Sequence, residues 1–328
     1  MTILFLGSGP FGVRALERLS SDPDRRVSLH VGTVPDAPSG RKRTLEPTVI
    51  KKCAQQLGLP VHEVATLKGE VGRSLLEATS ATVVITADFR LMLPRTFLES
   101  PPRHCFNLHG SILPRWRGAA PIVHGVLAGD RHFGVTLYRM VRELDAGPIV
   151  ACTDREFPDR VTASEIEEAL THCAADLIEA WIDRLLTGDF EARDQNPSDV
   201  TIAPKIAKHE GEIDWSDSAN SIDRRIRALA GWPRTWSHIE LRGTLERVFI
   251  DAADPRPPLE AASLEAAGPL EPGTITAIDR DGVELACGPD GRGRLVALEV
   301  QRAGRKRMRA ADFARGASLE VGRRFQRA

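Results

Sequence analysis

The sequence predicts an α/β domain with a mostly parallel, Rossmann-like sheet and helices on both of its faces, followed by a small OB-like β-barrel domain. Three observations favour this fold class. The chain opens with an apolar run, a glycine-rich turn and a stretch with helical spacing. Apolar runs and helical stretches then alternate through its first half, which is typical of parallel sheets covered by helices. Beyond a polar stretch near residue 195, short apolar runs recur between Gly, Pro and Asp, as they do in small barrels.

The elements of the first half follow from the spacing of apolar residues. Residues 3–6 form an apolar run before the glycine turn, so we expect a strand there, and residues 13–19 continue with helical spacing. Further strands are predicted at residues 27–31, 81–85, 103–108 and 134–140, and further helices at residues 49–57 and 163–186 and from Pro121 onward.

A change of character at residues 188–200 divides the chain. This stretch is polar and contains Asp194-Gln195-Asn196-Pro197-Ser198, which is typical of a linker. We therefore predict a first domain at residues 1–189, a linker at 190–207 and a C-terminal domain at 208–328. In the C-terminal domain we expect a helix at residues 218–230, a loop at 252–272, and strands at 236–240, 247–250, 274–278, 283–287 and 295–300.

Composition excludes several classes of protein. The 328 residues are 42% hydrophobic and 27% charged, which is ordinary for a globular protein, and a formal charge of -1 gives no global indication of a nucleic-acid partner. Five cysteines are scattered without ligand spacing, so we expect neither a disulfide framework nor a metal site. The sequence shows no leader and no apolar run long enough to span a membrane, which predicts a cytoplasmic protein without a membrane partner. No feature indicates a stable protein partner.

The spacing Gly7-x-Gly9-x-x-Gly12 matches the fingerprint of dinucleotide-binding turns, since it lies between a predicted strand and a predicted helix. The second requirement is not met, because the next strand ends in His30-Val31-Gly32-Thr33 rather than in an acidic residue that could bind ribose hydroxyls. Pro10 also removes a backbone N–H from the turn. We therefore interpret the glycines as a tight strand-to-helix turn.

Three polar residues have complementary chemistry: Asn107 and His109 end a predicted strand, and Asp145 lies in a Leu-Asp-x-Gly turn. Because side chains alternate along a strand, the first two project to the same face, beyond which ligands bind in open parallel sheets. An amide donor and an imidazolium would stabilise the oxyanion formed when an amine attacks a carbonyl, and a carboxylate would orient the imidazole or relay a proton. The pattern predicts acyl transfer to an amine without a nucleophilic serine or cysteine. The alternative is a buried polar pair and an ordinary turn residue.

Several motifs, in order along the chain, carry a family resemblance. The longest is Asn107-x-His109-Gly110-Ser111-x-Leu113-Pro114-Arg115-Trp116-Arg117-Gly118-Ala119-Ala120-Pro121-Ile122, and Leu144-Asp145-x-Gly147, Ile213-Asp214-Trp215 and Trp232-Pro233-x-Thr235-Trp236 follow it. With these motifs the chain resembles, over nearly its whole length, the 10-formyltetrahydrofolate-dependent formyltransferases, and among them the methionyl-tRNA formyltransferase family. The resemblance implies the formyltransferase fold for the first domain and tRNA binding by the OB-like domain.

The resemblance also implies roles for individual residues. Asn107 and His109 would face the formyl oxygen, and Asp145 would support His109 and the removal of a proton from the amine. 10-Formyltetrahydrofolate would be the formyl donor, as a co-substrate and without a metal. Its contacts would come from Phe89, Arg90, Leu91, Ser111, Ile112, Leu113 and Pro114. The acceptor would be the α-amino group of methionyl initiator tRNA, in translation initiation of the bacterial type.

Two basic regions concern the acceptor. Arg41-Lys42-Arg43 resembles the insertion through which the tRNA enzymes of the family reach the acceptor stem, and from Arg292 onward 11 basic residues accompany 3 acidic ones. A barrel with a basic face is a common device for binding nucleic-acid phosphates. We therefore expect tRNA contacts at Arg41, Lys42, Arg43, Arg305, Lys306 and Arg307.

One departure from the family pattern keeps a small acceptor open. The tRNA enzymes carry an aromatic-glycine pair where this chain has Phe89-Arg90, and an arginine at this place is similar to the glycinamide ribonucleotide transformylases. The alternative is a formyltransferase that acts on an amino sugar nucleotide or another small amine, a group that also carries appended C-terminal domains. A catalytically idle RNA-binding protein is disfavoured, because all three polar residues are present at the expected spacing.

Overall fold

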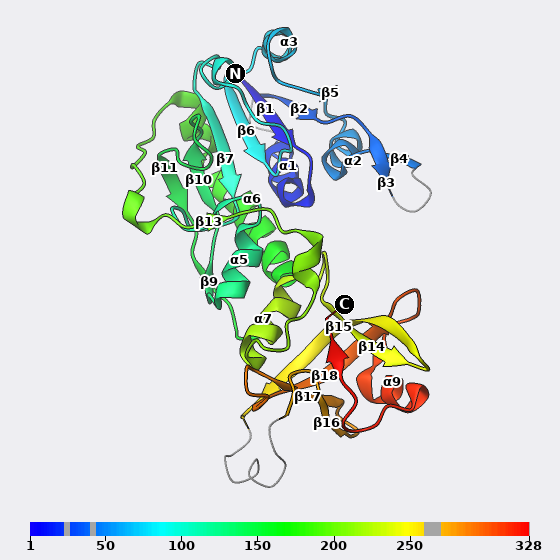
Figure 1. Ribbon diagram of the computed structural model, residues 1–328. Helices are drawn as coiled ribbons and strands as arrows, with labels where there is room; N and C mark the ends of the chain where they lie inside the picture. Colours follow the sequence, from blue (N-terminus) through cyan, green and yellow to red (C-terminus); the bar gives the residue numbers. More distant parts are fainter. Residues whose placement is uncertain (23–26, 40–43, 259–269, 328) are drawn as a thin grey trace. The chain divides into compact units, whose positions relative to one another are not determined.

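The computed structural model describes residues 1–22, 27–39, 44–258 and 270–327, which form two compact units (Figure 1). The first unit comprises Met1–Ile122, His132–Phe157 and Glu165–Pro204. The second comprises Val123–Arg131, Pro158–Ser164 and Lys205–Ala328. Each unit has its own large sheet and its own apolar core.

The first unit is built on a seven-stranded sheet with the order β11-β10-β7-β6-β1-β2-β5. Its strands are β1 (Thr2–Gly7), β2 (Ser28–Thr33), β5 (Val61–Glu63), β6 (Val83–Ala87), β7 (Cys105–His109), β10 (Thr136–Arg139) and β11 (Ile149–Cys152). The five strands from β7 to β5 pair in parallel, and β10 pairs antiparallel with both β7 and β11. The mostly parallel sheet is confirmed.

Helices cover both faces of this sheet. They are α1 (Val13–Ser20), α2 (Val49–Gln56), α3 (Glu70–Thr79), α4 (Arg95–Leu98) and α6 (Ala163–Thr187). Most of α5 (Pro121–Ala128) belongs to the second unit. Leu4 of β1 packs in one cluster with Leu75 of α3 and Phe97 of α4. The neighbouring Phe5 points the other way, towards the glycine turn and Ile50 of α2. The alternation of side chains along β1 therefore supplies two apolar faces.

Three small strand pairs complete the first unit. β3 (Ala37–Ser39) pairs with β4 (Thr44–Glu46), and β9 (His132–Phe133) pairs with β12 (Arg155–Glu156). β8 (Arg117–Gly118) pairs in parallel with β13 (Ile202–Ala203), so the segment predicted to be a linker adds a strand to the first unit.

The second unit is an antiparallel sheet that closes on itself. Its strands are β14 (Trp236–Leu241), β15 (Thr244–Arg256), β16 (Ile275–Ile278), β17 (Val283–Cys287), β18 (Gly293–Arg302), β19 (Met308–Arg309) and β20 (Phe325–Gln326). They follow the order β16-β17-β18-β15-β14-β20, with β19 beside β18. A bridge between Thr274 and Arg324 and a bond from Ile275 N–H to the Arg323 carbonyl at 2.7 Å link the two ends of this order. The predicted OB-like barrel is confirmed.

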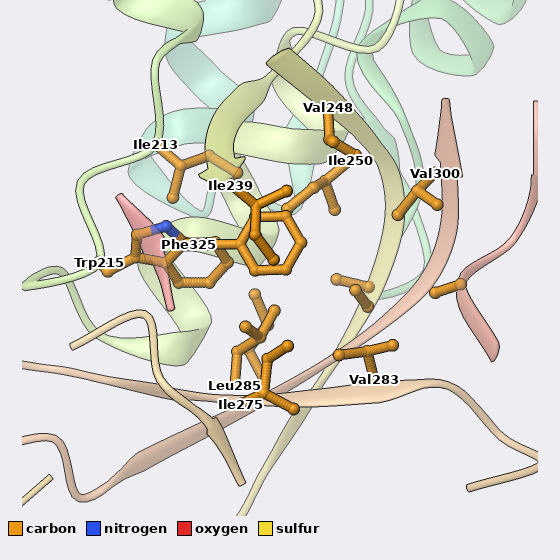
Figure 2. Packing of buried hydrophobic residues seen from close by; sticks show 14 of the residues in the cluster. Ile213, Trp215, Ile239, Val248, Ile250, Ile275, Val283, Leu285, Val300 and Phe325 are labelled. Carbon is orange, nitrogen blue, oxygen red and sulfur yellow. The ribbon is translucent and has the colours of Figure 1, made fainter. Parts of the chain in front are cut away.

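The core of the barrel is lined by side chains from almost every strand. Figure 2 shows Trp215 and Phe325 pointing into the same space as Ile239, Ile275 and Leu285. The buried indole N–H of Trp215 donates to the Ser237 hydroxyl at 3.0 Å, which satisfies the one polar group of this ring. Helices α7 (Ala219–Ala228) and α9 (Ala310–Ala317) add Ile222 and Phe313 to the same cluster.

Two expectations for this unit need correction. The loop predicted at residues 252–272 is wrong in its first part, because β15 continues to Arg256, and residues 259–269 lie outside the described chain. Helix α9 lies in the segment for which the sequence indicates only a basic tail. In the part of the chain that the structure describes, no helix is both long enough and apolar enough to cross a membrane.

Candidate active site

The first unit brings the three predicted polar residues together. Asn107 and His109 belong to β7, and Asp145 lies between β10 and β11. Because β10 runs antiparallel to β7, Thr136 lies beside His109 and Tyr138 lies beside Asn107. The turn after β10 returns Asp145 to the same side, where the Tyr138 hydroxyl contacts both Asp145 and Asn107.

The carboxylate of Asp145 receives donors from two segments. The Tyr138 hydroxyl donates to Oδ1 and the Gly118 N–H donates to Oδ2, each at 2.7 Å. His109 Nδ1 lies 3.8 Å from Oδ2, a separation that suits an ion pair and is too long for a hydrogen bond. Asp145 is 7% exposed and has a φ of 52°. Asp is among the few non-glycine residues that tolerate this left-handed conformation, so the residue type suits the turn.

The amide of Asn107 has a defined orientation. Thr86 of β6 donates its hydroxyl to Oδ1 at 2.6 Å, and Nδ2 donates to the Tyr138 hydroxyl at 3.3 Å. Because the single hydrogen of that hydroxyl is already given to Asp145, Tyr138 can only accept from Asn107. The network therefore fixes Nδ2 on this side and leaves one amide hydrogen for another acceptor.

The ring nitrogens of His109, which is 6% exposed, face different acceptors. Nε2 lies 3.0 Å from the Trp116 carbonyl oxygen, and since a carbonyl only accepts, Nε2 carries a hydrogen. Nδ1 faces the Asp145 carboxylate. An imidazolium offers an N–H to both oxygens, whereas a neutral ring would set its Nδ1 lone pair against the carboxylate. The arrangement therefore sets His109 Nδ1 opposite a carboxylate.

Two glycines allow the close packing around Asp145. A Cβ atom on Gly147 would lie 1.7 Å from the Arg139 carbonyl oxygen. A Cβ atom on Gly118 would lie 2.4 Å from the Ala203 carbonyl oxygen, and Gly118 has a φ of 130°. A side chain on Gly147 would push the turn of Asp145 away from Arg139, and a side chain on Gly118 would push β8 away from β13.

The residues predicted to contact folate lie in two loops. In the loop after β7, Ser111 and Leu113 are buried, Ile112 and Pro114 are half-buried, and Leu113 packs against Tyr138. The Leu113–Pro114 peptide bond is cis. The loop predicted to contact folate therefore begins directly after His109. Its Leu113 packs against Tyr138, whose hydroxyl contacts Asn107 and Asp145.

The second of these loops follows β6. Phe89 and Leu91 pack against the apolar cluster of β1, α3 and α4, and Arg90 is exposed. The Arg90 backbone N–H donates to the Ser8 hydroxyl at 3.4 Å. Further along, α4 and the residues after β10 enclose a pocket of about 440 Å³ that is lined by Arg95, Leu98, Glu99, His104, Arg139, Met140, Val141 and Arg142.

The glycine turn after β1 does not offer its amides to a ligand. The N–H groups of Ser8 and Gly9 both donate to the Asp88 carbonyl oxygen, at 3.0 and 3.1 Å. A Cβ atom on Gly9 would lie 1.5 Å from an oxygen of the Asp88 carboxylate, so this side chain occupies the space above the turn. The interpretation as a strand-to-helix turn agrees with these contacts, whereas phosphate binding would need the same N–H groups.

The predicted tRNA contacts have different surroundings. Arg41, Lys42 and Arg43 lie outside the described residues. Arg305 and Lys306 are exposed, and within the described chain their side chains have no partner, whereas Arg307 forms ion pairs with Asp251 and Glu299. Most other basic residues of the tail are also paired, namely Arg292 with Asp290, Arg294 with Glu284, Arg302 with Glu246, Arg315 with Asp312, Arg324 with Glu271 and Arg327 with Asp214. The basic excess of the tail is therefore largely neutralised within the second unit.

A pocket of about 450 Å³ on the second unit is lined by Lys208, His209, Glu212, Trp236, His238 and Arg247. The Arg247 guanidinium stacks on the Trp236 ring at 4.9 Å. Lys208 and Arg247 have no carboxylate partner in the part of the chain that the structure describes. Lys208 and Arg247 are therefore two further basic residues that could contact a nucleic acid, and the sequence alone does not separate them from arginines that form ion pairs.

Two residues of the first site were missed. Tyr138 is the chain's single tyrosine, and a hydroxyl in an apolar strand was the available signal. Burial, and then the neighbouring Asp145, hold the pKa of Tyr138 well above its usual value, so this hydroxyl acts as a hydrogen-bond donor. The sequence indicates Gln195 only as part of a polar linker.

No described part of the chain places three or more His, Cys, Asp or Glu side chains so that they could hold a metal ion.

The parallel sheet and the polar network at the end of β7 define an α/β protein equipped for acyl transfer. Comparison with known proteins identifies the class more closely. Residues 1–181 match the formyl transferase domain, and residues 205–318 match the formyl transferase C-terminal domain. The chain belongs to the formyl transferase family.

Curated relatives match the chain from end to end. It is 36% identical over 325 residues to a methionyl-tRNA formyltransferase of Methylococcus capsulatus, with 99% of each chain covered. It is also 36% identical over 326 residues to a methionyl-tRNA formyltransferase of Methylobacillus flagellatus, again with 99% of each chain covered.

Solved structures share the fold at lower identity. An N-formyltransferase of Helicobacter canadensis, in complex with folinic acid and dTDP-3-aminofucose, aligns with a TM-score of 0.63 at 14% identity, covering 92% of this chain and 98% of that one. HypX of Aquifex aeolicus, in complex with tetrahydrofolic acid, aligns with a TM-score of 0.60 at 17% identity, covering 97% of this chain and 48% of that one. At these identities the likeness concerns the fold.

Proposed function

We propose that this protein transfers the formyl group of 10-formyltetrahydrofolate to the α-amino group of methionyl initiator tRNA, for translation initiation in the cytoplasm of a bacterial cell. The observation that carries the proposal is the full-length similarity to relatives named methionyl-tRNA formyltransferase, which includes both domains at 36% identity. The network of Asn107, His109 and Asp145 supports the same reaction, because it offers hydrogen-bond donors and a carboxylate at one point.

The proposed chemistry is attack of the amine nitrogen on the formyl carbon. A C–N bond forms, the carbonyl oxygen becomes an oxyanion, and the bond from carbon to N10 of the folate then breaks. The amine loses one proton and N10 gains one, so the step is balanced. The free amide hydrogen of Asn107 would donate to the oxyanion, a contribution of several kcal/mol where such a donor is fixed in advance. Both ring nitrogens of His109 face other acceptors, so a protonated His109 would act through its positive charge.

The contacts of Asp145 suit a role in moving the proton. Its carboxylate is fixed by Tyr138 and Gly118, and it faces His109 Nδ1 at 3.8 Å. We propose that Asp145 supports the charge of His109 and accepts the amine proton, directly or through water. The folate is proposed to lie along the loops of Phe89 to Leu91 and Ser111 to Pro114, where Arg90 is exposed.

The fold alone does not distinguish a tRNA acceptor from an amino sugar nucleotide, since a sugar N-formyltransferase shares it. Contacts with tRNA are proposed at Arg41, Lys42 and Arg43 and at Arg305, Lys306 and Arg307. Arg305 and Lys306 are the stronger candidates in the second group, because their side chains have no ion-pair partner among the described residues. Arg307 already pairs with Asp251 and Glu299. Lys208 and Arg247 are added as candidates because they line a pocket on the second unit.

The direct test is a formyl-transfer assay with purified protein and 10-formyltetrahydrofolate. Charged initiator tRNA, charged elongator tRNA and amino sugar nucleotides are compared as acceptors under the same conditions. We expect turnover with methionyl initiator tRNA and little or none with the other acceptors. Faster turnover of an amino sugar nucleotide would replace this proposal by the small-amine alternative.

The catalytic assignment has its own test. Changing Asn107, His109 or Asp145 to Ala should lower kcat by about 100-fold or more, because removal of one preorganised group for the transition state costs a factor of this order. Binding of tRNA, measured by fluorescence titration, should stay within a few-fold of the unchanged protein. Arg73→Ala, at an exposed arginine of α3 that pairs with Glu70 of the same helix, is the control. A nearly unchanged kcat in any of the three variants would contradict that residue's assignment.

A further inference from the structure

Gln195 joins the turn of Asp145 to strand β8 through its side-chain amide. Nε2 donates to the carbonyl oxygens of Asp145 and Gly147, each at 2.8 Å. Oε1 accepts from Nε and a terminal nitrogen of Arg117, at 3.0 and 2.8 Å. Gln195 is 9% exposed, and both hydrogens and the oxygen of its amide are used.

These bonds act on the two groups that hold the Asp145 carboxylate. Asp145 Oδ2 accepts from the N–H of Gly118, the residue directly after Arg117. Gln195 therefore fixes the backbone that carries the carboxylate and the strand that carries its donor. The carboxylate lies 3.8 Å from His109 Nδ1, so a shift of either backbone segment changes this separation.

Gln195 lies between the two family domains along the sequence. The family domains match residues 1–181 and 205–318, so Gln195 lies in a stretch that neither domain includes. In the structure this stretch belongs to the first unit and ends in β13, which pairs with β8. A segment that resembles a linker in sequence thus supplies a buried residue one contact away from the site.

We propose that Gln195 is a positioning residue for formyl transfer, which holds the left-handed turn of Asp145 against β8 and thereby sets the carboxylate opposite His109. This inference rests on the proposed function of the site. The two bonds from Nε2 hold the carbonyl groups of Asp145 and Gly147, so they fix the backbone of this turn, in which Asp145 has a left-handed φ of 52°. Two charge-assisted bonds from Arg117 fix which side of the Gln195 amide faces the turn.

The test compares Gln195→Met, which keeps the length of the side chain but none of its hydrogen bonds, with Asn196→Ala as the control. Asn196 is the next residue, is exposed, and bonds only within its own turn. For Gln195→Met we expect kcat to fall about 10- to 100-fold, since misplacement of a reacting group by about 1 Å costs this much. The KM values for folate and acceptor should change less than about 3-fold. The control should retain the unchanged kcat.

A second variant separates positioning from general loss of stability. Gln195→Glu keeps the acceptor for Arg117 but sets a carboxylate oxygen against the two carbonyls of the turn. The added charge near Asp145 should move the limb of the pH–rate profile that reports the His109–Asp145 pair to higher pH. Arg117→Met should act through Gln195, so the double variant with Gln195→Met should be no slower than Gln195→Met alone.

A readout that needs no turnover keeps the two proposals distinct. The ring signals of His109, followed by NMR against pH, should shift in Gln195→Met and stay unchanged in Asn196→Ala. An unchanged His109 titration, or an unchanged kcat with whichever acceptor the protein uses, would overturn the positioning role. Absence of formyl transfer to methionyl initiator tRNA in the unchanged protein would overturn the proposed function and leave the NMR comparison decisive. If Gln195→Met does not fold, Arg117→Met is measured in its place by the same two readouts.

Discussion

At the scale of single residues, Tyr138 connects the predicted catalytic groups more directly than any of them connects to another. Its hydroxyl donates to Asp145 and accepts from Asn107, so it fixes a carboxylate and an amide at once. Because the pKa of this buried hydroxyl is raised, the bond keeps one direction over the whole working range of pH.

Tyr138→Phe removes this one oxygen and keeps the ring. Asp145 Oδ1 then loses its donor in a buried place, so the free energy of unfolding should fall by about 1–3 kcal/mol. We expect kcat to fall about 10-fold, because Asp145 and Asn107 both lose a fixed orientation. Urea unfolding and steady-state kinetics measure the two effects. Thr86→Val removes a donor to Asn107 and leaves both donors to Asp145, so it measures the part of the effect that comes from Asn107. An unchanged kcat in Tyr138→Phe would show that Gly118 holds Asp145 without help.

The sequence predicted Asn107, His109 and Asp145, because each belongs to a short motif whose residues carry suitable chemistry. It did not predict Tyr138 or Gln195. Tyr138 reaches the site through strand pairing, and Gln195 reaches it through the β8–β13 contact, 50 residues after Asp145. Relations of this kind depend on register and on tertiary packing, which spacing along the chain does not contain.

At the scale of elements, β15 shows why one strand was misjudged. Pro255 lies within it and pairs with Leu295 of β18. Over this part of β15 the pairing with β14 has ended, since that ladder stops at Phe249. A proline without an N–H is tolerated on an edge, whereas the sequence suggested a break. The same strand shows a shift of register near Ala252, which interrupts the alternation on which the prediction depended.

Strands β2 and β5 give a prediction about pH. His30 Nδ1 lies 3.0 Å from His62 Nε2, and burial, followed by the charge of His30, lowers the pKa of His62 below its ordinary value of 6.5. Folded His62 therefore binds fewer protons than the unfolded chain does. The stability that this difference represents is present above about pH 6.5 and is lost as the pH falls towards the lowered pKa.

His62→Gln should therefore reduce the loss of stability between about pH 6.5 and pH 5. Urea unfolding at steps across this range gives the slope of the unfolding free energy against pH. His132→Gln, at an exposed histidine of the same unit, is the matched control. A slope as steep in His62→Gln as in the unchanged protein would contradict the assignment.

At the scale of the whole molecule, charge counted along the sequence differs from charge that is available to a partner. The tail beyond Arg292 has a large basic excess, yet carboxylates of the same unit pair with most of its arginines. The partners Glu246 and Asp214 lie 56 and 113 residues from their arginines in sequence. The fold class could be predicted from the spacing of apolar residues. The ion pairs that neutralise the tail depend on how the strands of the barrel pack, and could not.

Changing both Arg305 and Lys306 to Glu should therefore raise the KM for tRNA about 10-fold. It should also reduce the dependence of tRNA binding on salt, by about one unit of the logarithmic slope for each phosphate that the protein no longer neutralises. Arg315→Glu, at an exposed arginine that is paired with Asp312, is the control and should leave both quantities nearly unchanged. Equal effects of the two changes would mean that net charge alone decides tRNA binding.

The closure of the barrel also has a consequence for the order in which the protein takes shape on the ribosome. Every strand of the large sheet in the first unit lies before residue 153, so that sheet can pair while the rest of the chain is still being made. The barrel needs Arg324 and Phe325 to join β16 to β20, so synthesis must pass these residues before it can close. A stop before Arg324 would therefore leave the sheet of the first unit complete and the second sheet without the bonds that join its two ends.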